Sequence, residues 1–137
     1  MHNAARSQMC EALLKHCGGD HFDAQSAGVE PWELNPLAVE VMAEIGIDIS
    51  QNRTKSVFDV WKSGEAFEYV IAVCDAESAE KCPIFPGLTK RLHWPFHDPS
   101  KLTGTHEQQL RKVRKIRDEI AAQIQDWLAS LPVEQLV

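Results

Sequence analysis

The feature that most constrains the fold is an unbroken apolar run from Tyr69 to Cys74. A strand that is buried on both faces of a parallel sheet has this composition, because neither face meets water. Amphipathic helical patterns precede and follow the run, so strands and helices alternate along the chain. We therefore expect an α/β fold of the doubly wound, three-layer kind. In such a fold, helices flank a small parallel sheet and ligands bind at the carboxyl ends of the strands.

Two helices are expected in the first third of the chain. The first follows Ser7 and is stopped by Gly18 and Gly19. The second begins at Asn35, a capping residue that is followed by proline, and ends at Gly46. The apolar positions that define their buried stripes are Met9, Cys10, Leu13, Leu14 and Cys17 in the first helix, and Ala38, Val41, Met42 and Ile45 in the second.

Further elements follow the same logic. Short strands are predicted at residues 21–27 and 91–94, and a short helix at residues 57–61. Thr105 and Gln108 form a capping box that begins the longest helix. The buried stripe of that helix is expected to hold Leu110, Val113, Ile116, Ile120, Ile124, Trp127, Leu128 and Leu131.

The composition fits one ordinary globular domain over residues 1–137, with 44% hydrophobic and 25% charged residues. A net charge of −6 argues against nucleic acid or an anionic membrane as a partner. No apolar run approaches the roughly 20 residues that span a bilayer, so no membrane association is expected. Four cysteines are too few for a disulfide scaffold, and they favour a cytoplasmic protein whose thiols stay reduced or do redox work.

The first residues of the chain form a candidate oxyanion site. A loop of small and polar residues leads into the first helix, and the N–H groups at a helix N-terminus attract anions. Arg6 adds a planar fork of donors that can grip two oxygens of a tetrahedral anion. Many helices begin after small residues, so the loop alone is weak evidence. The oxyanion-binding candidates are His2, Asn3, Ala4, Ala5, Arg6 and Ser7.

The stretch H-N-A-A-R-S-Q-M that starts at His2 resembles the tail of the C-x5-R-S phosphate loop of the low-molecular-weight tyrosine phosphatase superfamily. More narrowly, it resembles the thioredoxin-coupled arsenate reductases on that fold, and the resemblance continues to about Leu131. In that motif the nucleophilic cysteine lies six residues before the arginine, a position just before Met1. The resemblance therefore implies that the first strand and the nucleophile are absent from a truncated or misassigned start. The chain as written is expected to be inactive.

Cys74 closes the apolar run, and Cys82 lies in a polar loop followed by proline. From composition alone, we favour the interpretation that Cys74 is a buried core thiol and that Cys82 is an incidental surface thiol. The stretch from Val73 to Pro83, however, resembles the redox loop of the thioredoxin-coupled arsenate reductases. The resemblance implies that Cys74 attacks the first intermediate, that arsenite leaves, and that a Cys74–Cys82 disulfide is then reduced by thioredoxin.

Asp98 lies in the stretch H-W-P-F-H-D-P, where an Asp-Pro pair is as easily a plain turn as a functional site. The resemblance implies that Asp98 is the general acid that protonates the departing oxygen. It also implies that Arg6 orients the oxyanion and stabilises its transition state. Ser7 is either a hydrogen-bond donor to the nucleophile or a helix N-cap, or both. Asn3 is expected to support the loop in a left-handed conformation.

No metal and no cofactor are expected. Asn3, Glu11 and Ser26 match three potassium ligands of some relatives, but a lysine near the fourth position argues against the ion. Cys10 and Cys17 are expected to be core thiols, since their spacing to His16 and His21 fits no common zinc pattern. The basic cluster of the last helix is expected to be a solvated face, with the docking of an acidic partner as a minor alternative. Its members are Arg111, Lys112, Arg114, Lys115 and Arg117.

Three functions are compatible with these residues. The first is an arsenic-resistance enzyme that reduces arsenate to arsenite, with thioredoxin as its partner and Arg6, Cys74, Cys82 and Asp98 as catalytic residues. The second is a low-molecular-weight protein tyrosine phosphatase that binds a phosphate oxyanion, in which both relay thiols are silent. The third is a non-catalytic oxyanion-binding protein.

Overall fold

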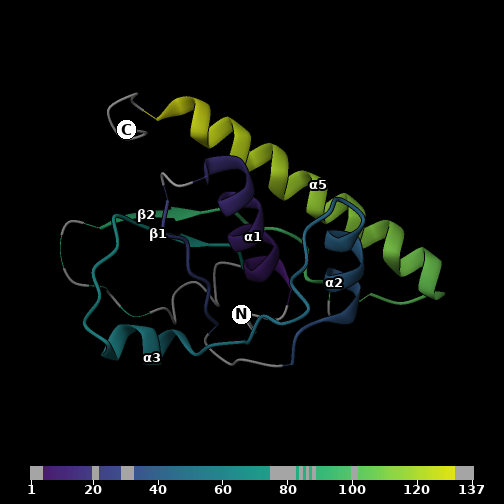
Figure 1. Cartoon of the computed structure of the whole chain (residues 1–137), viewed down its shortest axis with the longest axis horizontal. Helices are drawn as coiled ribbons and strands as arrows, with labels where there is room; N and C mark the ends of the chain where they lie inside the picture. The colour runs from purple at the N-terminus through teal and green to yellow at the C-terminus, as the bar shows by residue number, and fades with distance from the viewer. Residues whose placement is uncertain are drawn as a thin grey trace.

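The computed structural model describes residues 5–19, 22–28, 33–74, 83, 85, 87, 89–99 and 102–131. Within these ranges three helices come first, two consecutive strands follow, and a long helix comes last, so the predicted alternation of strands and helices is wrong for the described residues (Figure 1). The elements are α1 (Arg6–Gly18), α2 (Pro36–Ala43), α3 (Val57–Lys62), β1 (Tyr69–Ala72), β2 (Lys90–His93) and α5 (His106–Ser130).

The two strands pair in parallel, which confirms the predicted small parallel sheet. Their register places Tyr69 beside Lys90 at one end and Ala72 beside His93 at the other. The Trp94 N–H extends the ladder by donating to the Ala72 carbonyl at 2.7 Å. The side chains of β1 are half-buried rather than fully buried, because each strand of this two-stranded sheet is an edge strand. Strand β2 also begins one residue earlier than predicted.

The predicted strand at residues 21–27 is wrong as far as the structure describes it. Residues 22–27 carry no strand, and this stretch meets residues 55–57 only at its end, through a bridge between Gly28 and Ser56. The Phe22 ring instead lies 5.7 Å from the Trp127 ring, measured between centroids. Alternation of apolar residues cannot form a strand without a neighbouring backbone ladder, so packing on α5 decides the conformation here.

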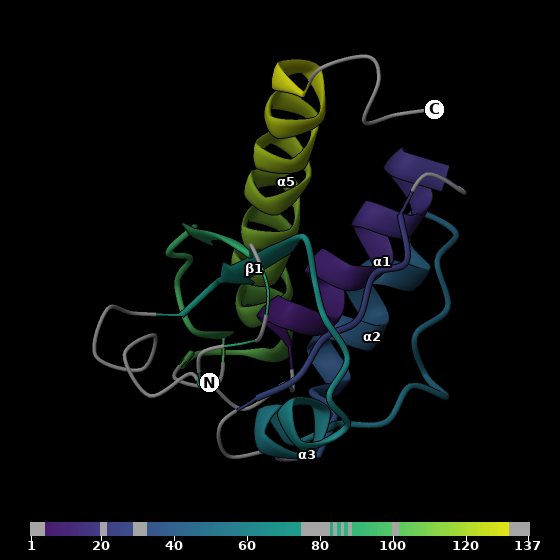
Figure 2. The ribbon, with the colours of Figure 1, turned by 90° about the vertical axis from the view of Figure 1, so that its left-hand side faces the viewer.

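The core lies where α5 crosses α1 and α2, as Figures 1 and 2 show from two sides. The predicted stripe of α5 is buried from Leu110 to Ile124, while Trp127, Leu128 and Leu131 at its end are half-buried. This stripe packs against apolar residues of the two shorter helices. Those residues include Met9, Leu13, Ala38, Val41 and Met42.

The predicted starts of α2 and α5 are confirmed, whereas α1 begins at Arg6, before the predicted start after Ser7. The Asn35 side chain accepts a hydrogen bond from the Leu37 N–H at 2.9 Å and caps α2. Both bonds of the Thr105–Gln108 capping box are present at the start of α5. Gly19 follows α1 with a φ of 59°, a value that favours glycine. Local capping chemistry therefore fixes where these helices begin and end.

Two residues of the predicted stripes face water. Cys17 is exposed because the last turn of α1 buries Gly18, where an added Cβ would come within 2.5 Å of the Phe22 ring. Ile45 is 42% exposed because α2 ends at Ala43 and Ile45 lies in the turn that follows. Cys17 thus lies within α1 but on its exposed side, whereas α2 ends before its periodic pattern does.

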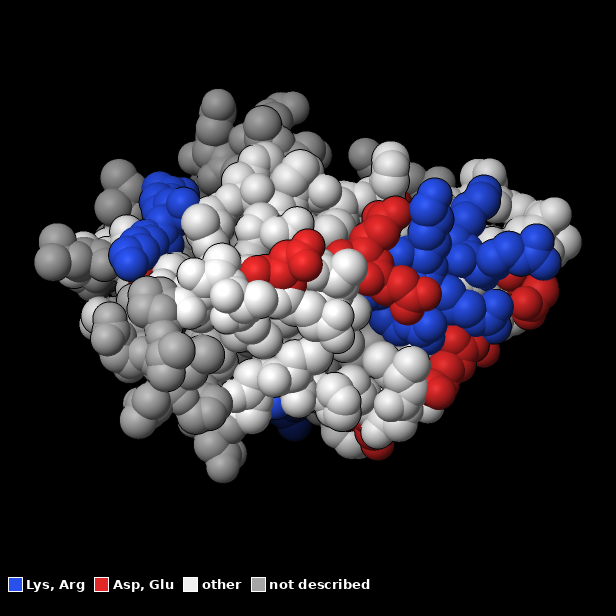
Figure 3. Space-filling model, turned by 90° about the horizontal axis from the view of Figure 1, so that it is seen from above, with Lys and Arg blue, Asp and Glu red and all other residues white. Residues whose placement is uncertain are grey.

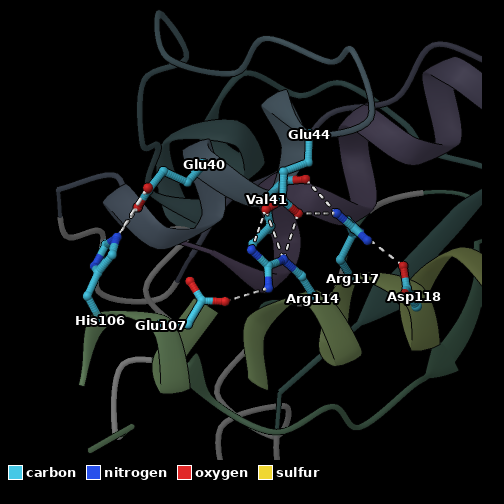
Figure 4. Close-up of polar contacts among 8 residues, drawn as sticks. All are labelled: Glu40, Val41, Glu44, His106, Glu107, Arg114, Arg117 and Asp118. Carbon is cyan, nitrogen blue, oxygen red and sulfur yellow. Dashed lines mark hydrogen bonds and ion pairs between the residues drawn. The ribbon is translucent and has the colours of Figure 1, made fainter. Parts of the chain in front are cut away.

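Some side chains of the basic cluster of α5 are exposed to water, and others contact the end of α2. Arg111, Lys112 and Lys115 are exposed, and Figure 3 shows basic side chains gathered at one end of the molecule, with acidic ones among them. Arg114 and Arg117 instead reach Glu44 at the end of α2, at 2.8 and 3.0 Å (Figure 4). The expected solvated face is therefore confirmed for the first three residues, holds in part for Arg114, whose side chain is 33% exposed, and is wrong for Arg117, whose side chain is 11% exposed. No helix in the described part of the chain is both long and apolar enough to cross a bilayer.

Candidate active site at the start of the first helix

Arg6 occupies the first position of α1 and is only 8% exposed. The N-cap residue is Ala5, so the N-cap alternative for Ser7 is wrong, and its hydrogen bond to the nucleophile stays a prediction. The Ala5 side chain makes no capping hydrogen bond, and the first turn of α1 contains no acidic residue. The electrostatics at this end of α1 therefore favour an anion. His2, Asn3 and Ala4 lie outside the described residues, so their oxyanion roles stay predictions.

The Arg6 guanidinium joins α1 to the segment that follows β2. Its Nη1 donates to the Phe96 carbonyl at 3.0 Å, and its Nη2 lies 3.8 Å from Oδ2 of Asp98. The Arg6 and Asp98 side chains are 9% and 23% exposed, so water screens this ion pair only in part. The structure thus brings together the predicted oxyanion-binding cation and the predicted general acid, which are far apart in the sequence.

Gln8 supports the same end of α1, and the sequence did not point to it. Its side chain amide is fully enclosed, with the residue 1% exposed. The amide donates to the Arg53 carbonyl and accepts from the Asn52 side chain, each at 3.1 Å. These bonds tie the first turn of α1 to the connection before α3. A lone glutamine outside the apolar stripe looks like a surface residue, so no sequence signal indicates this role.

Cys74 lies two residues beyond β1 and is buried, 9% exposed. The His93 ring, at the end of β2, contacts the Cys74 carbonyl through Nε2 at 2.5 Å. Three residues after His93, the Phe96 carbonyl binds Arg6. The segment from His93 to Asp98 therefore contacts both the backbone of the proposed relay cysteine and the Arg6 guanidinium. Cys82 lies outside the described residues, so its pairing with Cys74 stays a prediction.

The other thiols differ in their exposure. Cys10 is buried in α1, and the loss of hydration raises its pKa to about 12, with a smaller contribution from the charge of Glu11. This confirms Cys10 as a core thiol, whereas Cys17 is exposed. In the part of the chain that the structure describes, no three His, Cys, Asp or Glu side chains gather in a way that could hold a metal.

A family model for low-molecular-weight phosphotyrosine protein phosphatases matches residues 1–136. The chain is 42% identical to an arsenate reductase from Shouchella clausii over 125 residues, which cover 91% of this chain and 88% of the relative. It is 32% identical to the structure of a thioredoxin-dependent arsenate reductase from Corynebacterium glutamicum, with a TM-score of 0.71. That match covers 95% of this chain and 57% of the other.

A further structure, an arsenate reductase in the phosphate binding state, shows the same fold. Its TM-score is 0.75 at 24% identity, and the match covers 96% of this chain and 93% of the other. The family model and the relatives span nearly the whole sequence rather than one motif. The chain therefore belongs to the low-molecular-weight phosphotyrosine protein phosphatase family, as a relative of its arsenate reductases.

Proposed function

We propose that this protein reduces arsenate to arsenite through a relay of cysteine thiols, with thioredoxin as the final reductant. The observation that carries the proposal is the extended sequence similarity to arsenate reductases, 42% over nine tenths of the chain for the Shouchella clausii protein. The described residues supply a buried arginine, a nearby aspartate and a buried thiol at the end of β1. The arginine and the aspartate suit the binding of a tetrahedral oxyanion, and the thiol suits a redox step after the oxyanion has bound.

Arg6 is proposed to bind arsenate and to stabilise the charge that develops on its oxygens. The helix N-terminus adds a positive potential from the backbone. Asp98 is proposed to donate a proton to the oxygen that leaves when a thiolate attacks arsenic. Its distance of 3.8 Å from Arg6 keeps it beside the bound anion.

The relay then moves two electrons to arsenic. The nucleophilic thiolate first replaces an oxygen on As(V), which leaves as water after protonation. The Cys74 thiolate next attacks that sulfur, so a disulfide forms, the sulfur–arsenic bond breaks, and its electron pair stays on arsenic as arsenite. Cys82 then attacks the Cys74 sulfur and frees the first thiolate. Thioredoxin finally reduces the Cys74–Cys82 disulfide by thiol–disulfide exchange.

The test measures arsenite released per enzyme molecule, with thioredoxin and its reductase as the sole reductant. These 137 residues hold no cysteine six positions before Arg6, so the protein is expressed from the whole reading frame of its gene. Wild-type protein should turn over repeatedly. Cys74→Ser should release almost no arsenite, and Cys82→Ser should release about one arsenite per enzyme molecule. Cys17→Ser, which changes an exposed thiol far along α1, is the matched control and should behave as wild type.

Turnover of an aryl phosphate by the same variants separates this proposal from a phosphatase. Both relay variants should keep aryl phosphate turnover, because water hydrolyses a phosphocysteine without a second thiol. Repeated arsenate turnover by Cys82→Ser would contradict the relay. Fast aryl phosphate turnover with no arsenate reduction in wild type would identify a phosphatase on this fold.

A further inference from the structure

The backbone ladder between β1 and β2 stops one step before Cys74. The Lys90 N–H donates to the Glu68 carbonyl at 2.8 Å, and the Trp94 N–H donates to the Ala72 carbonyl at 2.7 Å. Every second residue of β2 thus donates to every second carbonyl beside it, as a parallel pair requires. If the same pattern continued by one step, the Phe96 N–H would donate to the Cys74 carbonyl.

The chain leaves the ladder before that step is reached. Strand β2 ends at His93, and beyond Trp94 the chain turns so that the Phe96 carbonyl binds Arg6. The His93 ring takes the place of the missing backbone donor, because its Nε2 contacts the Cys74 carbonyl. A carbonyl oxygen can only accept a hydrogen bond, so Nε2 carries the proton and donates.

We propose that His93 is a positioning residue for Cys74, which holds the backbone of the relay thiol at the exit of β1. The inference rests on the proposed function for the step it affects. Cys74 is buried at the end of a four-residue strand, and the described ladder stops at Ala72. A side-chain hydrogen bond to its carbonyl therefore restricts how far the thiol can drift from the segment that contacts Arg6.

The second step of the relay is the one that depends on this restriction. Cys74 must approach the first sulfur in line with the sulfur–arsenic bond, and small displacements of a reacting group are costly to such attacks. The first attack on arsenate needs only the nucleophile, Arg6 and Asp98. Loss of the His93 bond should therefore slow arsenite release and leave aryl phosphate turnover unchanged.

The variants are chosen on one face of one strand. His93→Leu removes the donor, and His93→Gln keeps an N–H donor at similar reach. Arg91→Leu is the matched control, because Arg91 is also exposed and side chains two apart share a face. His93→Leu should slow single-turnover arsenite release at least tenfold, with aryl phosphate kcat within twofold of wild type. His93→Gln should recover to within threefold of wild type, and Arg91→Leu should match wild type.

A second readout does not depend on arsenate. Alkylation of Cys74 by iodoacetamide, followed by peptide mass spectrometry, should be at least threefold faster in His93→Leu and near wild type in His93→Gln. Equal slowing of both reactions, or a glutamine variant no better than leucine in either readout, would overturn the positioning role. If wild type reduces no arsenate while the alkylation pattern holds, the relay proposal fails and the His93 contact stands.

Discussion

Arg6 Nη2 lies 3.8 Å from Asp98 Oδ2, so the first residue of α1 reaches the carboxyl group proposed as the general acid. The Nη1 nitrogen of the same side chain donates to the Phe96 carbonyl, two residues before Asp98. The segment that contains Asp98 therefore also holds the Arg6 guanidinium in place. The proposed binding of the substrate and the proposed donation of the proton would therefore both depend on this one side chain.

Arg6→Lys should lower kcat/KM for arsenate and for an aryl phosphate by roughly 10²–10³, which corresponds to about 3–4 kcal/mol. Lysine keeps the positive charge but has no planar fork, so it cannot hold the Phe96 carbonyl and two oxyanion oxygens together. Steady-state kinetics with both substrates check this, and Arg91→Lys on exposed β2 is the control. A loss smaller than threefold for either substrate would show that Arg6 does not contact the reacting anion.

Asp98→Asn should lower kcat by roughly 10²–10⁴ for aryl phosphates whose leaving groups need a proton. The loss should be smaller for esters whose leaving groups are stable as anions. An acid acts only when protonated, so the wild-type rate should fall as the pH rises, and the variant should lose this fall. The pH profiles of kcat for a strong and a weak leaving group check it. If kcat of Asp98→Asn still falls at high pH as it does in wild type, another group donates the proton.

Much of the framework follows from local signals in the sequence. The capping box of Thr105 and Gln108 and the Asn35 cap act within a few residues, so the sequence alone locates both helix starts. The parallel sheet follows from the apolar run and from the helices on either side of it. Arg6 and Asp98 are both visible as motif residues, although their contact depends on the fold.

The remaining features depend on contacts between distant segments. Residues 22–27 have the alternation of a strand, but pairing is decided by neighbouring backbone, and Phe22 packs on Trp127 instead. Gln8 is buried because Asn52 and Arg53 satisfy its amide, and neither partner is near it in sequence. The His93 contact with Cys74 requires a ladder that ends one step early, which no local pattern reveals.

The raised pKa of Cys10 predicts a thiol that stays neutral and unreactive in the folded protein. Its pKa of about 12, caused first by burial, leaves almost no thiolate at pH 8. Exposed Cys17 should react with iodoacetamide in the native state, and Cys10 should react only after unfolding. Peptide mass spectrometry of protein labelled with and without urea checks both sites. Native labelling of Cys10 at the rate of Cys17 would contradict its burial.

The same pKa makes stability depend on alkaline pH. Between about pH 9 and pH 12 the unfolded thiol is ionised and the folded thiol is protonated, so the folded state binds more protons. The free energy of unfolding should therefore fall as the pH rises, by up to about 1.4 kcal/mol per pH unit from this group. Urea unfolding at pH 8 and pH 10 should show a smaller fall in Cys10→Ala than in wild type. Equal falls would show that Cys10 ionises in the folded protein.

Arg117 should stabilise the contact between α2 and α5 more than any exposed cation of the basic cluster. Its side chain is 11% exposed, and Nη1 donates to the Val41 carbonyl at 2.8 Å in the last turn of α2 (Figure 4). Such carbonyls have no partner within their own helix, and a cation also suits the negative end of the helix dipole. The same nitrogen reaches Glu44 at 3.0 Å.

Arg117→Ala leaves the Val41 carbonyl without this donor and should lower the free energy of unfolding by about 1–3 kcal/mol. Arg111→Ala, an exposed position on the same helix, should change it by less than about 0.5 kcal/mol. Arg117→Lys should fall between them, because lysine keeps the charge but cannot donate to the carbonyl and to Glu44 with one planar group. Urea denaturation of the three variants at neutral pH measures the differences. If Arg117→Ala is no less stable than Arg111→Ala, the helix contact rests on the apolar stripe alone.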